Sequence, residues 1–509
     1  MPLAKVLSGT IVGLESVTVT TEVNIENTGF PSFTIVGLAD KAVEEAKERV
    51  RSAIKSCNFE FPRHRIVVNL TPADLPKKGA LFDLPIALGV LIAAEAITVD
   101  VSDSLFFGEL SLDGSLRFTP GAISLAMLAR ASALQNFYGP EINAREAAFV
   151  PNISVFGLKN LQELVNHLQQ AVSLAKVPPQ DINELLKSET VASNDFFDVR
   201  GQESAKRALE IAAAGGHNIA MKGPPGSGKT MLARALPSIL PKLTAEEAYE
   251  VTKIYSVTGN LPANDSFIKC RPFRSPHHTT SRIGLIGGGS HPSPGEVSLA
   301  HRGVLFLDEF PELDRSTLEA LRQPVEDGFV AVSRAAGTLT FPCRFMLVVA
   351  CNPCPCGNKG NQVKKCVCSR SQIDRYQKRV SGPILDRIDI HVEVPAVELD
   401  KLVTEESTAS ENSQIIRDRV QTARRIQENR FKDLGITCNA EMSSKLVKQF
   451  CFLDSECLNV MRTAVNSLGL SARGYFRVIK VARTIADLAN SKTIIKDHLA
   501  EALQYRAQA

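Results

Sequence analysis

One short segment restricts the fold of this chain more than any other. Eight residues fit the pattern G-x-x-x-x-G-K-S/T at every position: Gly223, Pro224, Pro225, Gly226, Ser227, Gly228, Lys229 and Thr230. A strand candidate (219–221) precedes them and helix-forming residues (231–236) follow, which argues against a chance loop of this composition. The glycines let backbone N–H groups face phosphate oxygens at a helix N-terminus. We expect Lys229 to reach the β- and γ-phosphates of ATP and Thr230 to bind Mg²⁺.

Two carboxylates follow a second apolar strand candidate. Residues 304–307 are all apolar, and Asp308 and Glu309 come directly after them. Open α/β sheets bind ligands at the C-terminal ends of such buried strands. We expect Asp308 to hold the Mg²⁺ shell and Glu309 to orient or polarise the attacking water. The pattern is weak evidence alone and strong evidence beside the phosphate-binding loop.

Three further polar residues are candidates for the same site. Asn352 comes directly after an apolar strand candidate (345–350), where its amide would hydrogen-bond the attacking water or the γ-phosphate; the alternative is a turn asparagine. Arg387 lies among apolar residues, and we expect it to reach the γ-phosphate bound by a neighbouring subunit, or else to pair with Asp386 or Asp389. Arg473 is a candidate second phosphate sensor, in competition with Arg477.

Four of the eleven cysteines form the pattern C-x-C, nine residues, C-x-C, namely Cys354, Cys356, Cys366 and Cys368. Two close pairs supply four thiolates to one tetrahedral zinc, and such a closed site is structural. The alternatives are thiols without metal and, because no export signal is apparent, least of all disulfides. The other cysteines are interpreted as core or incidental residues.

Composition and length set the frame for these sites. The chain has 509 residues, which suggests about three domains. Its formal net charge of +3 is too small to predict a partner, so any nucleic-acid surface must be local. The N-terminus has no signal-peptide pattern, and the most apolar stretch (84–96) is shorter than the roughly 20 residues that span a bilayer. We therefore expect a cytoplasmic protein without membrane contact, in which 84–96 is a buried helix.

Strand and helix patterns alternate over residues 1–170 and again over 198–394, which predicts an α/β protein. Between them, 176–197 holds paired prolines, charges and small polar residues, which suits a surface linker. Strands are expected at 17–19, 34–36 and 65–70, and helices at 40–56 and 122–134. Residues after Pro395 are mostly helical in pattern.

The order of these motifs resembles that of the magnesium-chelatase-like AAA+ proteins, specifically the ComM/YifB group. The resemblance covers essentially the whole chain and rests on long runs at 273–281, 287–289, 294–301, 352–357 and 381–395, and on the run 482–488 (ARTIADL) with the alanine after it. It implies four segments: a Lon-protease-like domain of the ribosomal-S5 α/β type (1–172), a linker (173–197), an AAA+ core with the zinc knuckle (198–394) and a helical lid (395–509). It also implies a ring-shaped, hexameric ATPase that binds single-stranded and branched DNA. In that group the activity is branch migration during natural transformation.

The Lon-like domain departs from the pattern of active peptidases. The turn at 78–83 has no serine, and the helix that begins near residue 122 has no lysine in its first turns. Because a Ser–Lys dyad needs both side chains, we expect no peptidase activity. The domain is expected to scaffold the ring or bind DNA, with Lys77 and Lys78 as phosphate contacts or, equally, as solvated turn residues.

Two segments are candidate DNA loops. Residues 271–302 are too rich in glycine and proline for a buried helix, and 331–340 has the pattern of a β-hairpin. In the resembled proteins insertions at these places face the pore, so Arg334 is expected to contact a backbone phosphate, unless it is a surface arginine. His277 and His278 have no metal-ligating partner at helical spacing, and we expect local hydrogen bonds for both.

We expect a DNA translocase, and three other functions compete with it. A metal-chelatase motor subunit has a similar core, but such subunits generally begin close to their AAA+ module. An ATP-dependent protease is opposed by the missing dyad. A nucleotide-switched regulator remains open, although Lys229, Asp308 and Glu309 favour turnover.

Overall fold

The computed structural model describes ten stretches of the chain, residues 3–26, 30–77, 79–187, 194–262, 265–289, 292–334, 337–359, 364–379, 382–396 and 411–506. It divides into two compact units. The first unit comprises Met1–Ser188 and Ala245–Lys269, and the second comprises Glu189–Thr244 and Cys270–Ala509.

A seven-stranded mixed sheet forms the centre of the first unit. Its order is β3 (Ser32–Val36), β4 (Arg65–Thr71), β2 (Glu15–Glu26), β1 (Ala4–Val12), β5 (Ser104–Phe106), β8 (Asn136–Pro140) and β9 (Ser154–Leu158). The long strands β1, β2 and β4 pair antiparallel, and the other neighbours pair parallel. In β2, Val19, Val23 and Ile25 are buried at alternate positions, as expected for a strand with one face on the core. The three strands expected in this region are confirmed.

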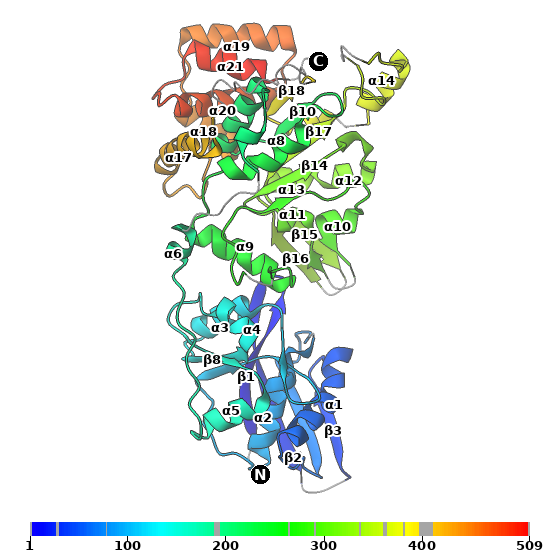
Figure 1. Cartoon of the computed structure of the whole chain (residues 1–509), viewed down its shortest axis with the longest axis vertical. Helices are drawn as coiled ribbons and strands as arrows, with labels where there is room; N and C mark the ends of the chain where they lie inside the picture. Colours follow the sequence, from blue (N-terminus) through cyan, green and yellow to red (C-terminus); the bar gives the residue numbers. More distant parts are fainter. Residues whose placement is uncertain are drawn as a thin grey trace. The chain divides into compact units, whose positions relative to one another are not determined.

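Helices cover this sheet (Figure 1). They are α1 (Lys41–Ser56), α2 (Asp83–Ala93), α3 (Ala122–Ala131), α4 (Glu141–Ala147) and α5 (Leu161–Leu168), and the short helix α6 (Ile182–Lys187) follows them in the chain. Asp40 caps α1 by accepting a 2.9 Å hydrogen bond from the Val43 N–H. Ten of the eleven residues of α2 are buried, so the buried helix expected near 84–96 is confirmed. Among the described residues, no helix combines the length and apolar character needed to cross a membrane.

The second segment of the first unit begins with α9 (Ala245–Val257). The Tyr249 hydroxyl donates to the Phe149 carbonyl, and the rings of Phe149 and Phe267 lie 4.5 Å apart. The Ser256 hydroxyl donates to the carboxylate of Glu146, whose pKa is raised by burial. The sequence analysis placed this segment within the range 198–394, because no local pattern marks its association with residues 1–188.

The second unit contains a parallel five-stranded sheet in the order β11 (Phe273–Arg274), β14 (Val304–Leu307), β17 (Met346–Cys351), β10 (Ile219–Lys222) and β18 (Ile390–Glu393). Both neighbours of β10 therefore run parallel to it, and their C-terminal ends meet at the end of β10. All four residues of β14 are buried, as the sequence predicted. Helices α7 (Glu203–Gly215) and α8 (Lys229–Ala235) flank β10 in the chain.

Smaller elements surround this sheet. They are α10 (Arg282–Ile286), β12 (Gly287–Gly288), β13 (Ser293–Pro294), α11 (Glu296–Leu299), α12 (Arg315–Ala320), α13 (Arg322–Asp327), β15 (Phe329–Arg334), β16 (Gly337–Pro342), α14 (Arg370–Gln377) and α15 (Gly382–Leu385). Strands β15 and β16 pair antiparallel, so the expected hairpin is confirmed. The described residues of the stretch 271–302 (271–289 and 292–302) form short elements, as its glycines and prolines predicted.

Residues 411–506 of the second unit are mainly helical. They form α17 (Ser413–Arg430), α18 (Ser444–Phe450), α19 (Ser455–Leu468), α20 (Ala472–Leu488) and α21 (Lys496–Gln504). Helices α17 and α20 pack against α7, and their buried residues share one apolar core with the parallel sheet. The α/β fold class with C-terminal helices is confirmed.

Candidate functional site

The predicted phosphate-binding loop connects β10, which lies between β17 and β18 in the parallel sheet, to α8. Gly226 and Gly228 have φ angles of 76° and 91°, a left-handed backbone that other residues rarely adopt. A Cβ added at either glycine would meet no atom within 4 Å, so the space beside them is open. Gly223 is required for another reason, because its added Cβ would lie 2.0 Å from the Val394 carbonyl oxygen. The glycines thus set the curl of the loop and let it lie against β18.

The ammonium group of Lys229 lies inside this curl. Its Nζ donates hydrogen bonds of 2.8 Å to the carbonyls of Gly223 and Pro224. The side chain is buried, and burial lowers its pKa. Among the described residues, no carboxylate forms an ion pair with it. The Ser227 hydroxyl lies 3.5 Å from the same nitrogen. A buried cation surrounded by neutral oxygen atoms suits an anionic ligand.

The two predicted Mg²⁺ ligands lie in contact. Thr230 Oγ1 donates a 3.0 Å hydrogen bond to Oδ2 of Asp308, which follows β14. Adjacent ligands of an octahedral Mg²⁺ ion are about 2.9 Å apart, given metal–oxygen distances of about 2.05 Å, so this pair of hard oxygen atoms fits the ion.

Glu309 has a partner that the sequence analysis missed. Its carboxylate is half exposed, and Oε2 lies 3.2 Å from Nδ1 of His278. His277, by contrast, forms the expected local contact, 2.9 Å from the Thr279 hydroxyl. Because β11 and β14 pair in parallel, the loop after β11 reaches the same sheet edge as Glu309. The pairing of β11 with β14 is therefore what would have predicted the contact of His278 with Glu309. Because β11 has only two residues, the sequence does not reveal that pairing.

Asn352 directly follows β17, which pairs with β10 on the side towards β14. The Gly223 N–H donates a 3.1 Å hydrogen bond to the Cys351 carbonyl, so the end of this strand is tied to the phosphate-binding loop. The structure therefore brings Asn352 to the same edge as Asp308 and Glu309.

The candidate arginines form ion pairs within the second unit. Arg387 and Arg473 both contact Glu326 in α13, Arg473 at 3.3 Å. The Arg473 side chain is 60% exposed. Arg477 pairs instead with buried Asp389, and it lowers the pKa of that carboxylate against the effect of burial. The alternative given for Arg387 was a pairing with Asp386 or Asp389; the structure has Arg387 on Glu326 and Arg477 on Asp389.

The four sulfur atoms of the predicted zinc knuckle lie within 4.8 Å of one another. Three of the separations are 3.5 to 3.6 Å, between the sulfurs of Cys354, Cys356 and Cys366. Tetrahedral zinc with bonds of about 2.3 Å places its sulfur ligands about 3.8 Å apart, so the cluster fits this ion. All eleven cysteines lie in the described part of the chain, and none forms a disulfide there.

The three predicted DNA contacts have different outcomes. Lys77 is fully buried, and its Nζ donates to the Pro72 carbonyl, so this placement does not support a contact with DNA. Lys78 lies outside the described residues. Arg334 ends β15 opposite Gly337, and its side chain is also outside the described part.

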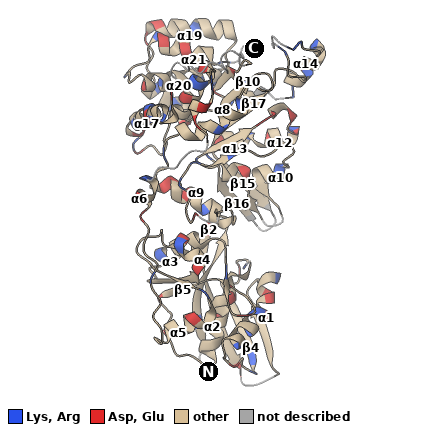
Figure 2. Cartoon of the chain, in the orientation of Figure 1, with Lys and Arg blue, Asp and Glu red and all other residues tan. Residues whose placement is uncertain are grey.

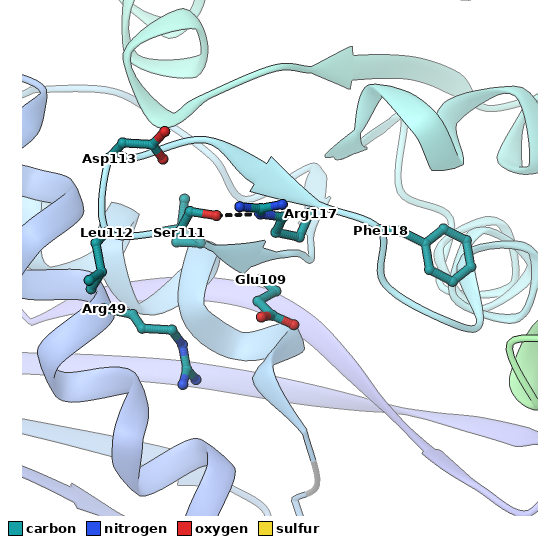
Figure 3. A pocket seen from close by; sticks show the side chains of 8 residues that line it. Arg49, Glu109, Ser111, Leu112, Asp113, Arg117 and Phe118 are labelled. Carbon is teal, nitrogen blue, oxygen red and sulfur yellow. Dashed lines mark hydrogen bonds between the residues drawn. The ribbon is translucent and has the colours of Figure 1, made fainter.

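An open cavity of about 790 Å³ lies in the first unit, beside the short hairpin of β6 (Glu109–Leu110) and β7 (Leu116–Arg117). Figure 3 shows Arg49, Glu109 and Arg117 among the side chains that line it. Its one serine, Ser111, accepts a 2.6 Å hydrogen bond from Arg117 Nε.

Comparisons with known proteins agree across the chain. The family model described as magnesium chelatase, subunit ChlI, matches residues 195–402, and two related ChlI models match 21–143 and 410–506. The chain is 43% identical to competence protein ComM of Haemophilus influenzae, over 100% of this chain and 98% of that protein. It is 42% identical to YifB of Escherichia coli, over 100% and 97%. Lon protease 2 of Bacillus subtilis is 28% identical over 36% of each chain.

Proposed function

The chain belongs to the ComM/YifB group of magnesium-chelatase-like AAA+ ATPases, and on this premise we propose that it is a DNA translocase that promotes branch migration during homologous recombination in natural transformation. The observation that carries the proposal is full-length similarity to a protein named for competence, together with an intact set of residues for ATP hydrolysis. A cytoplasmic location stays a prediction from the sequence.

Each residue of the site has a chemical task in this proposal. The phosphates of ATP displace the loop carbonyls from Lys229, whose charge then has an anionic partner. Thr230 and Asp308 hold Mg²⁺, which supplies charge neutralisation at the phosphates. Glu309 accepts the proton of the attacking water, and Asn352 hydrogen-bonds that water or the γ-phosphate.

The proposed assembly is a homo-oligomeric ring, a hexamer, in which Arg387 acts on the nucleotide of the neighbouring subunit. To do so Arg387 must exchange its Glu326 partner for phosphate. The exposed side chain of Arg473 favours it over Arg477 as the second sensor, because Arg477 is engaged by a buried carboxylate.

The proposed DNA contacts are local. Figure 2 shows acidic and basic residues interspersed on the helices of both units, in keeping with a net charge of +3. Backbone phosphates are therefore bound by loops in the ring, with Arg334 on the β15–β16 hairpin as the first candidate and Lys78 as the second.

Zinc is the proposed ion for the four-cysteine cluster. The sulfur separations support this ion, and a site with four thiolates leaves no open position for catalysis. Its role is therefore to fix the chain that follows Asn352.

A second function is a motor subunit of a metal-chelatase-like complex, which the ChlI family models favour. A nucleotide-switched regulator is the third. Only the translocase requires DNA to change the hydrolysis rate.

The deciding experiment is ATP hydrolysis with single-stranded, duplex and four-way-junction DNA, alongside displacement of a labelled strand from a branched substrate. Wild type is expected to be stimulated by DNA at low salt, where phosphate contacts are strongest. Glu309→Gln is expected to bind DNA and ATP without strand displacement. Hydrolysis unchanged by every DNA, with no DNA binding, would refute the proposal and leave the two alternatives.

A further inference from the structure

The four-cysteine cluster lies directly beside the phosphate-binding loop. The chain leaves β17 at Cys351, whose carbonyl accepts the Gly223 N–H, and reaches Cys354 three residues later. Strands β10 and β17 are paired up to Lys222 and Cys351. The loop that binds phosphate and the loop that carries the sulfurs therefore start from neighbouring strand ends.

A second contact joins the two loops further along. Gly357 has a φ of 77°, and a Cβ added to it would lie 2.5 Å from Cδ and 2.6 Å from Cγ of Pro225. The Pro225 ring thus rests on the bare backbone of Gly357. Glycine is needed here both for the left-handed backbone and for this close approach.

The turn that carries Gly357 is built around Cys354. The Gly357 N–H donates to the Cys354 carbonyl at 2.9 Å, and the Lys359 N–H donates to its sulfur at 3.3 Å. Cys354 is fully buried, whereas the other three cysteines of the cluster are half buried. A metal held by all four sulfurs would fix this turn, and with it the surface on which Pro225 rests.

We propose that metal bound by the four cysteines holds the turn 354–359 against Pro225 and thereby sets the affinity of the phosphate-binding loop for nucleotide. The physical reason is preorganisation, because loop N–H groups and Lys229 bind phosphate only when the curl of the loop is already in place. Loss of the metal removes the cross-link between two segments of chain, and the turn loses its fixed geometry. The inference rests on the zinc site proposed above and is independent of DNA.

The first test removes a ligand. Cys366→Ser is compared with Cys270→Ser, the same substitution at an exposed cysteine outside the cluster. Zinc content is measured by elemental analysis, and affinity by fluorescence titration with a labelled ADP. Wild type and Cys270→Ser are expected to hold one zinc per chain, whereas Cys366→Ser loses it and binds ADP about ten-fold more weakly.

The second test breaks the contact and keeps the metal. Gly357→Ala leaves all four cysteines in place, and its methyl group must displace Pro225. Gly435→Ala is the matched control, because Gly435 has a φ of 68° with no atom within 4 Å of its added Cβ. Gly357→Ala is expected to retain one zinc and to bind ADP about ten-fold more weakly, and Gly435→Ala to bind as wild type does.

The outcomes separate the two proposals. Wild-type protein without stoichiometric zinc overturns the metal site and this inference together. Gly357→Ala with full zinc and wild-type affinity overturns the coupling and leaves the zinc site standing, and it decides the matter even if Cys366→Ser fails to fold. A failure of DNA to stimulate hydrolysis affects neither result.

Discussion

Each unit contains a glycine turn that leads to a helix with a buried charge at its start, but the two charges are satisfied differently. In the first unit, Gly79 precedes α2, and Asp83 forms a two-point ion pair with Arg49 at 2.6 and 3.0 Å. Asp83 also accepts the Leu110 N–H. In the second unit, Gly228 precedes α8, and within the described residues Lys229 has hydrogen bonds to neutral oxygen atoms of its own loop and no ion pair. A charge with a counter-ion in the chain stabilises a fold, whereas a charge without one is available to a ligand.

The sharpest way to break this comparison is to remove Lys229. Lys229→Ala is expected to lower the rate of ATP hydrolysis by about 100-fold or more, because the positive charge that stabilises the phosphate oxygens in the transition state is lost. The midpoint of thermal unfolding should change little, since no ion pair is broken. Lys448→Ala, at an exposed position of α18, is the control for both measurements. A variant that unfolds instead would place Lys229 in the same class as Asp83.

Arg49→Ala tests the opposite half of the comparison. Breaking a buried ion pair costs about 3 kcal/mol, so the first unit should be destabilised while hydrolysis by folded protein persists. Burial raises the pKa of Asp83 to about 6 even though Arg49 lowers it. Without Arg49 the pKa of Asp83 in the folded protein rises further above its value in the unfolded chain. The folded state then holds a proton that the unfolded state has released, so the free energy of unfolding falls as pH rises through the folded-state pKa.

Chemical unfolding at pH 5 and pH 8 measures this effect. The destabilisation by Arg49→Ala should be larger at pH 8. Arg51→Ala removes an exposed contact with Glu48 and a cation–π contact with Phe61, and should cost about 1 kcal/mol at either pH. Equal losses for the two variants would contradict a structural role for the Arg49–Asp83 pair.

A smaller effect is expected for His278, which sharpens the comparison within the second unit. His278→Ala should lower kcat by about ten-fold with little change in KM for ATP, because Glu309 loses the group that orients it as a base. His277→Ala is the comparison variant, since His277 hydrogen-bonds Thr279 and its ring lies 4.1 Å from that of His278, whereas the contact with Glu309 is made by His278. If both variants behave alike, the contact with Glu309 has no part in turnover.

Arg473 and Arg477 give the smallest expected difference between an arginine that binds a ligand and an arginine that stabilises the fold. Arg473→Ala should reduce hydrolysis by up to about five-fold, equivalent to the roughly 1 kcal/mol of an exposed ionic contact, without loss of stability. Arg477→Ala should instead lower the unfolding midpoint, since it leaves the buried Asp389 without its guanidinium partner. Steady-state rates and calorimetry on the two variants test this assignment, and the reverse pattern would exchange their roles.

Features that depend on neighbouring residues in sequence could be predicted well. The glycine loop, the apolar run of β14 and the spacing of the cysteines each determine their own local structure, and the structure agrees with them. Features that depend on which strands and helices meet in space could not. His278 reaches Glu309 only through the pairing of β11 with β14, and Glu326 meets two arginines that lie far from it in sequence. Lys77, a lysine in a Pro/Lys/Gly turn, is buried because its backbone joins residues 38–40.

The association of residues 245–269 with the first unit affects the order in which the two units can fold during synthesis. Chains fold as they leave the ribosome, N-terminal segments first. Here the first unit is incomplete when its first 188 residues have emerged, because Phe149 and Glu146 still lack α9 and Phe267. By the time that segment arrives, the phosphate-binding loop has already been synthesised. The first unit therefore cannot complete its core before synthesis of the second unit has begun. A fragment that ends at residue 188 would lack part of the core of the first unit.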